Sequence, residues 1–284
     1  MRVDLGGRAF AEGVRPPALM GVVNVTPDSF HPGSRSLDLP HAVSRGISMI
    51  DEGASIIDIG GESTRPGAMP VGVGDELSRT IPVIEGILHE RPDAFMSVDT
   101  SKPRVASEAL RKGCRMINDV TGAENEEMID LIADAGAQIC VMHMKGEPRT
   151  MQVDPGYDDV VSEVGAYLSG RVNALVEAGI PPRNILVDPG IGFGKRLEDN
   201  IALLKAGREV VPREDVRLLW GVSRKRMFLD LLGRKDSNDR LFGTLGVAAS
   251  AVCSGVDVLR VHDVLEHADL LKAMTSTIRG PIDE

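Results

Sequence analysis

Short apolar runs alternate with helical patterns along most of the chain. The runs are Leu19–Val25, Ser55–Gly60, Ala94–Val98, Arg115–Asn118, Gln138–Met142, Asn184–Val187, Arg217–Val222 and Asp257–Val261. Continuous apolar runs of this kind are typical of strands that are buried on both faces of a parallel sheet. The helical patterns that follow them lie near 40–52, 75–90, 103–112, 125–135, 158–178, 198–210, 225–232 and 264–278. Eight alternations of strand and helix predict an α/β fold, the (β/α)8 TIM barrel.

Two further elements are expected beside the barrel. An extra helix is predicted over 240–253, before the last strand, and the first residues, VDLGGRAF, predict a short hairpin with a Gly-Gly turn. The chain has 284 residues and 42% hydrophobic content, which is enough for one large core. We therefore expect a single domain over 1–284.

Charge and composition exclude several classes of function. The formal net charge is −10, so general nucleic-acid binding, which needs clustered Lys and Arg, is not expected. The first residues contain no apolar signal-peptide segment, and no run approaches the roughly 18 apolar residues of a membrane span. Cys114, Cys140 and Cys253 have no CxxC spacing and are expected to be buried and reduced. These features predict a cytoplasmic protein without a membrane partner.

Polar side chains recur where each predicted strand ends. In strand order they include Asn24, Asp58, Asp99, Asn118, His143, Asp188, Ser223 and Arg260. The C-terminal ends of barrel strands meet at one rim, where barrel enzymes carry their active sites. Helix capping is the alternative, and it fits Asp263 and Asp119 about as well, but it does not explain one polar group per strand around the ring.

The chemistry of these groups indicates a ligand. Asp99, Asn118 and Asp188 offer acceptors and amide groups that match the N–H edge of an amino-pyrimidine heterocycle. The cations Arg65, Lys225, Arg260 and His262 suit a phosphate leaving group. Asn24 is a candidate ligand for Mg²⁺, which usually bridges phosphates with few protein ligands. We therefore expect a heterocycle pocket inside the barrel and an anion site at its mouth.

Seven short motifs in order resemble the dihydropteroate synthase family. They are NVTPDSF at 24–30, GGESTRPGA at 60–68, SVDT at 97–100, INDVTG at 117–122, DPGIGFGK at 188–195, GVSRKR at 221–226 and RVHDV at 260–264. The resemblance implies joining of a pterin pyrophosphate to para-aminobenzoate, with Mg²⁺. It also implies a homodimer, for which we expect an interface near 225–253 and 264–278.

The resemblance also implies a role for each matching residue. The pterin ring is held by Asp99, Asn118, Asp188, Lys225 and Arg260. The pyrophosphate is held by Asn24, Thr64, Arg65, Arg260 and His262, with Mg²⁺ on Asn24. The aminobenzoate site is lined by Phe30, Thr64, Pro66, Lys225 and Arg226. The residues expected to act in catalysis are Asn24, Arg65, Lys225, Arg260 and His262.

One loop departs from the family pattern. After NVTPDSF the family usually has a small residue and then Asp-Gly-Gly, whereas this chain has His31-Pro32-Gly33-Ser34. Pro32 therefore replaces an acidic residue that the family places near the reacting centre. We expect a retained pterin site beside a changed aminobenzoate site, and with it reduced sensitivity to sulfonamides.

Five other polar residues receive structural interpretations. His143 is expected in the core with a satisfied hydrogen bond, and His267 on a solvated surface. Lys195 is interpreted as a surface lysine, Asp58 as a partner for loop amides, and Arg224 as part of an ion pair that stabilises the barrel.

Two alternative functions share the pterin-binding residues. A pterin-dependent methyltransferase, which passes a methyl group from a methylated folate to a corrinoid protein, does not need the pyrophosphate cations. Because NVTPDSF and STRPG are both present, the sequence argues against it. A non-catalytic pterin-binding paralogue is supported only by Pro32.

Overall fold

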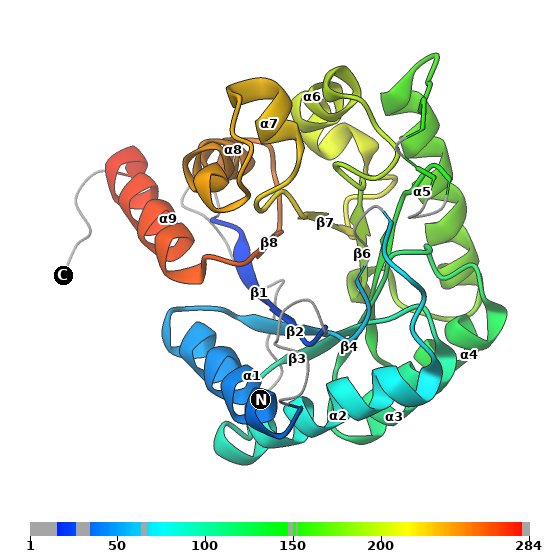
Figure 1. The fold of residues 1–284 in the computed structure, drawn as a ribbon. Coiled ribbons are helices and arrows are strands. Elements are labelled where there is room, and N and C mark those ends of the chain that lie inside the picture. Colours follow the sequence, from blue (N-terminus) through cyan, green and yellow to red (C-terminus); the bar gives the residue numbers. More distant parts are fainter. Residues whose placement is uncertain (1–15, 27–34, 64–66, 147–149, 152, 280–284) are drawn as a thin grey trace.

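The computed structural model of the chain describes residues 16–26, 35–63, 67–146, 150–151 and 153–279. Within them eight parallel strands close a barrel in sequence order, with helices around it (Figure 1). The strands are β1 (Ala18–Asn24), β2 (Ile56–Gly60), β3 (Met96–Asp99), β4 (Met116–Asp119), β5 (Gln138–Met142), β6 (Ile185–Asp188), β7 (Arg217–Trp220) and β8 (Val258–Val261). The predicted (β/α)8 barrel is confirmed.

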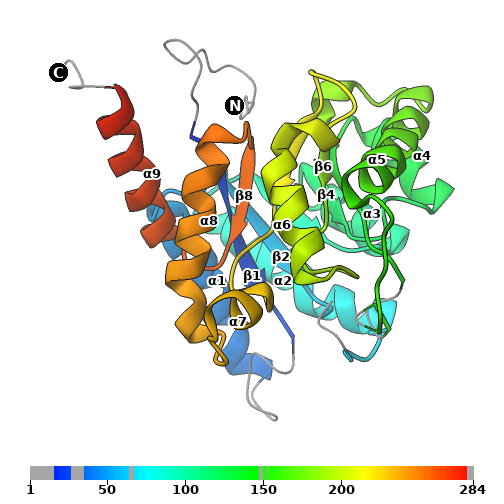
Figure 2. The ribbon, with the colours of Figure 1, turned by 90° about the horizontal axis from the view of Figure 1, so that it is seen from above.

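Nine α-helices are described within the same residues. They are α1 (Arg35–Asp51), α2 (Val73–Glu90), α3 (Pro103–Arg111), α4 (Glu126–Ala135), α5 (Val160–Glu177), α6 (Leu197–Ala206), α7 (Met227–Leu232), α8 (Leu241–Cys253) and α9 (Val264–Arg279). The extra helix before the last strand is confirmed as α8. Turned by 90°, the view places α8 between α9 and α6 in front of the barrel (Figure 2). None of the described helices is both long and apolar enough to cross a membrane.

Two predicted helices differ from the observed ones by more than two residues at one end. The first begins at Arg35, five residues before the expected position, with Pro40 inside it. The pattern expected over 198–210 divides at Gly207, where the α-helix gives way to a 3-10 turn over Gly207–Val210. Gly207 has φ +53, and a Cβ there would lie 3.0 Å from the carbonyl oxygen of Ser254. The predicted N-terminal hairpin lies outside the described residues.

The barrel interior has an apolar floor. Its buried cluster consists of Ala18, Met20, Ile56, Phe95, Met116, Cys140, Leu186, Leu219 and Val258. Since side chains alternate along a strand, the residue two positions further on also points inward, nearer the C-terminal rim. Two steps beyond Ile56, Met116, Leu186 and Val258 come Asp58, Asn118, Asp188 and Arg260. The strand period therefore places a polar layer directly above an apolar one.

Candidate active site

Arg260 is the centre of the polar layer. Its Nε donates to Oδ2 of Asp58 and its Nη2 to Oδ2 of Asp99, both at 2.7 Å. Asn118 Nδ2 donates to the same Asp58 oxygen at 3.1 Å. Strands β2, β3, β4 and β8 thus contribute to one network across the barrel.

The Asp58 carboxylate is a structural partner of the site and not of loop amides, so that interpretation was wrong. Asp58 is completely buried, and its Oδ2 accepts from Arg260 and Asn118. Its Oδ1 has no hydrogen-bond partner among the described residues. A buried carboxylate oxygen without a donor is costly, so this atom suits a ligand that brings an N–H group.

Burial and neighbouring charges shift the pKa values of the groups in this network. The pKa of Asp99 is raised to about 7, chiefly by burial; the charge of Arg260 opposes the rise, and the carboxylates of Asp58 and Glu76 add to it. Burial alone lowers the pKa of Arg260, but the charges of Asp58 and Asp99 outweigh it, and the net pKa is raised. The guanidinium therefore stays charged while Asp99 titrates near neutrality.

Asp188, at the end of β6, contributes a further carboxylate to the pocket. It is buried, and its Oδ1 accepts from the backbone N–H of Gly190 at 2.7 Å. Burial raises the pKa of Asp188, opposed by this hydrogen bond and by the charges of Lys225 and Lys195. A Cβ on Gly221, the residue after β7, would lie 3.4 Å from Asp188 Oδ2, so the glycine leaves room beside the carboxylate.

Lys225 follows β7 and faces the same space. Burial lowers its pKa to about 8, opposed by Asp188. Its Nζ lies 3.9 Å from the ring centroid of Phe193, in the loop after β6. Phe193 was not singled out from the sequence, although a lone aromatic residue in the glycine-rich DPGIGFGK motif was a usable signal.

At the mouth of the barrel, His262 and Asn24 lie at two strand ends. His262 follows β8, and its Nδ1 lies 3.0 Å from Oγ of Ser223. Asn24 ends β1, and a Cβ on the neighbouring Gly60 would lie 3.5 Å from its Oδ1 and 3.9 Å from Asp99 Oδ2. The amide of Asn24 and the Asp99 carboxylate therefore flank the same glycine.

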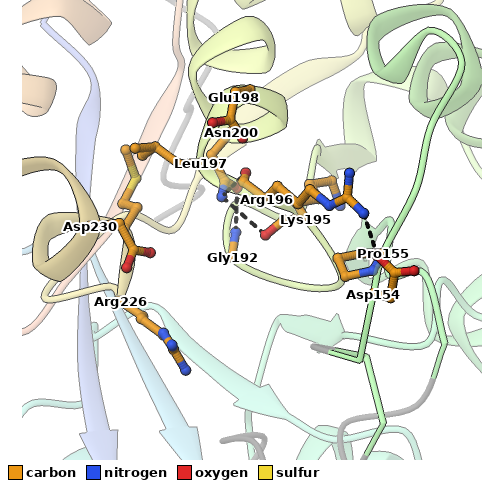
Figure 3. Close-up of a pocket in the computed structure, with 11 residues that line it drawn as sticks. Asp154, Pro155, Gly192, Lys195, Arg196, Leu197, Glu198, Asn200, Arg226 and Asp230 are labelled. Atoms are coloured by element: carbon orange, nitrogen blue, oxygen red, sulfur yellow. Dashed lines mark hydrogen bonds and ion pairs between the residues drawn. The ribbon is translucent and has the colours of Figure 1, made fainter.

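Several predicted site residues lie outside the described part of the chain. These are Phe30, Thr64, Arg65 and Pro66, together with the changed segment His31–Ser34. Arg226 is described, and it is exposed at the start of α7. It lines a cavity of about 390 Å³ with Gly192, Lys195 and Asn200 (Figure 3). The structure thus places Arg226 on the β6–β7 side of the rim, outside the network around Arg260.

Other sequence interpretations have mixed outcomes. His143 is buried, as expected, and its Nδ1 lies 2.9 Å from Nζ of Lys195. Lys195 was expected on the surface, but it is only 3% exposed. His267 is likewise completely buried, because it lies on the inner face of α9, where its Nδ1 contacts the carbonyl of Asp263 at 2.6 Å.

The interpretations of Arg224, of the two candidate helix caps and of the cysteines also have mixed outcomes. Arg224 does form an ion pair, to Asp263, so the carboxylate for which helix capping was the alternative binds a guanidinium. Asp119 accepts from Thr121 within the loop, and it is Asn125 that caps α4. Cys114 and Cys140 are buried, but Cys253 is exposed at the end of α8.

Comparison with known proteins agrees with this geometry. A family described as "Pterin binding enzyme" matches residues 20–262. Dihydropteroate synthase of Escherichia coli K12 is 43% identical over 262 residues, 92% of each chain. The Xanthomonas albilineans dihydropteroate synthase structure with 4-aminobenzoic acid has a TM-score of 0.87 at 42% identity, covering 93% of this chain and 94% of that one. The Burkholderia cenocepacia enzyme complexed with 7,8-dihydropteroate has a TM-score of 0.83 at 41% identity, covering 92% and 91%.

Proposed function

The chain belongs to the dihydropteroate synthase family, and on that premise we propose how its residues join 6-hydroxymethyl-7,8-dihydropterin pyrophosphate to para-aminobenzoate. The family activity is that of a transferase. The observation that carries the proposal is the polar layer around Arg260, which rests on the apolar floor of the barrel. We place a flat heterocycle at this polar layer, with its polar edge toward the carboxylates.

Buried hydrogen-bond acceptors recognise the pterin. Asp99, Asn118 and Asp188 face its amino-pyrimidine edge, whose neighbouring N–H groups match the two oxygens of a carboxylate. Asp188 is already oriented by the N–H of Gly190, so its side chain loses little conformational entropy on binding. Arg260 is held in place by Asp58 and Asp99, and its planar guanidinium is suited to lie against the ring.

The reaction exchanges one bond at the pterin methylene. The C–O bond to pyrophosphate breaks, and its electron pair leaves with the pyrophosphate. The lone pair of the arylamine then forms the C–N bond, and the amine loses a proton. Such a step depends on stabilising a leaving anion, which is the task we assign to Asn24, Thr64, Arg65, Arg260 and His262.

We propose a magnesium ion at the mouth of the barrel, held by few protein ligands. Among the described residues no cluster of three or more His, Cys, Asp or Glu side chains could hold a metal ion by itself. Mg²⁺ commonly takes one or two protein oxygens and completes its shell with phosphate oxygens and water. The amide oxygen of Asn24 would be the protein ligand, and the ion would neutralise charge on the departing pyrophosphate.

We place the second substrate on the β6–β7 side. Lys225 and Arg226 supply positive charge for the carboxylate of aminobenzoate, with Phe30, Thr64 and Pro66 as further lining. Since the pKa of Lys225 is about 8, its ammonium is present at neutral pH and is lost as the pH rises above that value. The changed His31–Ser34 segment leads us to propose reduced sulfonamide sensitivity.

A homodimer is supported by an apolar surface over α7, α8 and α9, which lie side by side (Figure 1). Phe242 is 84% exposed there, and Leu231, Leu232 and Leu265 are each about half exposed. Exposed apolar patches of this kind are typical of interaction sites, and a second copy of the chain is the occupant we propose. A cytoplasmic location stays a prediction from the sequence.

One incubation tests the activity. The purified protein is mixed with the pterin pyrophosphate, aminobenzoate and Mg²⁺, and dihydropteroate and pyrophosphate are measured. We expect both products in a 1:1 ratio. A non-catalytic paralogue would bind a pterin but release no pyrophosphate, and a methyltransferase would act only with a methylated folate and a corrinoid acceptor. Either of those results would refute the proposed reaction.

A further inference from the structure

The loop after β6 packs directly on the backbone of the loop after β5. Gly190, Gly192 and Gly194 all have positive φ, at +69, +82 and +61. A Cβ at Gly190 would clash with the carbonyl oxygen of His143, and one at Gly194 with that of Lys145. The glycines of DPGIGFGK are therefore needed for both backbone conformation and close approach.

Lys195 is buried at the contact between these two loops. Its Nζ lies 2.9 Å from Nδ1 of His143, and it donates to the carbonyls of Phe193 at 3.0 Å and His143 at 3.3 Å. Burial lowers the pKa of Lys195 to about 7, with Asp188 opposing this and Lys225 adding to it. Two further charges act on its pKa, Asp199 raising it and Lys145 lowering it. Burial, together with the neighbouring lysines, lowers the pKa of His143 to about 3, so the imidazole is neutral beside the amine.

Asn200 holds the same loop from the side of α6. Its Oδ1 accepts from the N–H of Gly192 at 2.7 Å (Figure 3). Its Nδ2 donates to the carbonyl of Arg196 at 2.8 Å. Asn200 thus holds both ends of the segment from Gly192 to Arg196, and Phe193 lies within it.

Phe193 connects this loop to the reacting side of the site. Its carbonyl accepts from Lys195, and its ring lies against the ammonium of Lys225, 3.9 Å from centroid to Nζ. A Cβ on Gly192 would lie 3.2 Å from Cδ of Lys225, so the loop backbone also contacts the lysine stem. Lys225 therefore depends on the β6 loop for its position.

We propose that Lys195 is a positioning residue, which holds Phe193 so that its ring sets the ammonium of Lys225 beside the second substrate. A solvated surface lysine would make none of these contacts, and an apolar side chain would fill the space without a desolvation cost. Lys195 gives up its hydration to join the carbonyls of two loops, and the residue between them carries the ring. The inference rests on the proposed function of Lys225.

A double-mutant cycle tests the proposal. Lys195→Met removes the amine at nearly constant shape, and Phe193→Leu removes the ring that transmits its effect. In the native background we expect Lys195→Met to lower kcat/KM for aminobenzoate about tenfold. In the Phe193→Leu background the same substitution is expected to change it less than twofold, since coupled residues are not additive. Equal losses in both backgrounds, or no loss in the native one, would overturn the proposal.

Two controls keep the result interpretable. Lys205→Met makes the same change at an exposed position on α6 and should leave kcat/KM unchanged. Lys195→Gln, a second variant in case Lys195→Met does not fold, keeps an N–H donor near the Phe193 carbonyl and should retain more activity than Lys195→Met. If Lys195→Gln retains no more activity than a folded Lys195→Met, the positioning role is wrong. If Lys195→Gln alone folds, the cycle is run with it, and equal losses in the native and Phe193→Leu backgrounds would overturn the proposal. Absence of turnover in the native protein would instead refute the reaction itself.

Discussion

The two halves of the barrel rim hold their polar side chains in different ways. Around Arg260, side chains from β2, β3, β4 and β8 bind one another, so charge organises the pocket. Between β6 and β7 a glycine-rich backbone is packed against a neighbouring loop, and Lys195 and Phe193 hold it there. The first half depends on paired charges and the second on loop shape. Substitutions in the first half should therefore reduce stability and pterin binding, and those in the loop after β6 should affect the second substrate. Asp188, which ends β6 before that loop, is grouped with the pterin-binding carboxylates.

The largest effect is expected from Arg260→Met. Without the guanidinium, Asp58 and Asp99 become buried carboxylates without a cation, which costs about 3–5 kcal/mol in the free energy of unfolding. Urea denaturation at pH 8 measures this loss. Arg213→Met is the control: it removes an exposed ion pair with Asp215, which solvent screens, and should cost far less.

The same variant has a predicted pH dependence. The pKa of Asp99 is about 7, above its ordinary value, so folding takes up a proton between about pH 4 and pH 7. The stability contribution of Asp99 is thus present below pH 4 and is lost as the pH rises through 7. Without Arg260 the pKa rises further, so the loss caused by Arg260→Met should shrink from pH 8 to pH 5. A loss that does not depend on pH would contradict the assigned charges.

Asp188→Ala is expected to have the next largest effect. Removing a buried carboxylate leaves the N–H groups of the pterin without partners, which costs about 2–4 kcal/mol in binding. Calorimetry with a pterin analogue measures the affinity. Asp215→Ala, at an exposed position before β7, is the control. Unchanged affinity in Asp188→Ala would remove this residue from the pterin site.

A smaller effect is expected from His262→Gln, which separates ring recognition from leaving-group stabilisation. We expect kcat to fall about tenfold, or about 1.4 kcal/mol. Binding of a pterin that lacks pyrophosphate should change less than twofold. If both quantities fall together, His262 serves the ring and the proposed division of the site is wrong.

The smallest effect is expected at Pro32, which lies outside the described residues. Pro32→Asp restores the acidic residue of the family pattern, and proline restricts both its own φ and the residue before it. We expect the KM for aminobenzoate and the inhibition constant of a sulfonamide to change by more than twofold, about 0.4 kcal/mol. If neither constant changes by that much, the loop difference is neutral.

The order of strands and helices could be predicted because period and burial are local properties of the sequence. The position of the rim could be predicted from the ends of the strands. The same pattern placed Asp99, Asn118, Asp188 and Arg260 at that rim. The partners could not be predicted in the same way: Asp58 binds Arg260 across 202 positions of sequence. Lys195 and His267 were misplaced because a polar residue type favours the surface, whereas tertiary contacts buried both.

The central claim is that the pterin lies on the network around Arg260 and the arylamine on the β6–β7 side. A crystal structure with a pterin analogue and aminobenzoate bound tests it most directly. We predict the heterocycle edge on Asp99, Asn118 and Asp188, and the aminobenzoate beside Phe193 and Lys225. A heterocycle bound instead in the cavity beside Arg226, away from Asp188, would contradict the account.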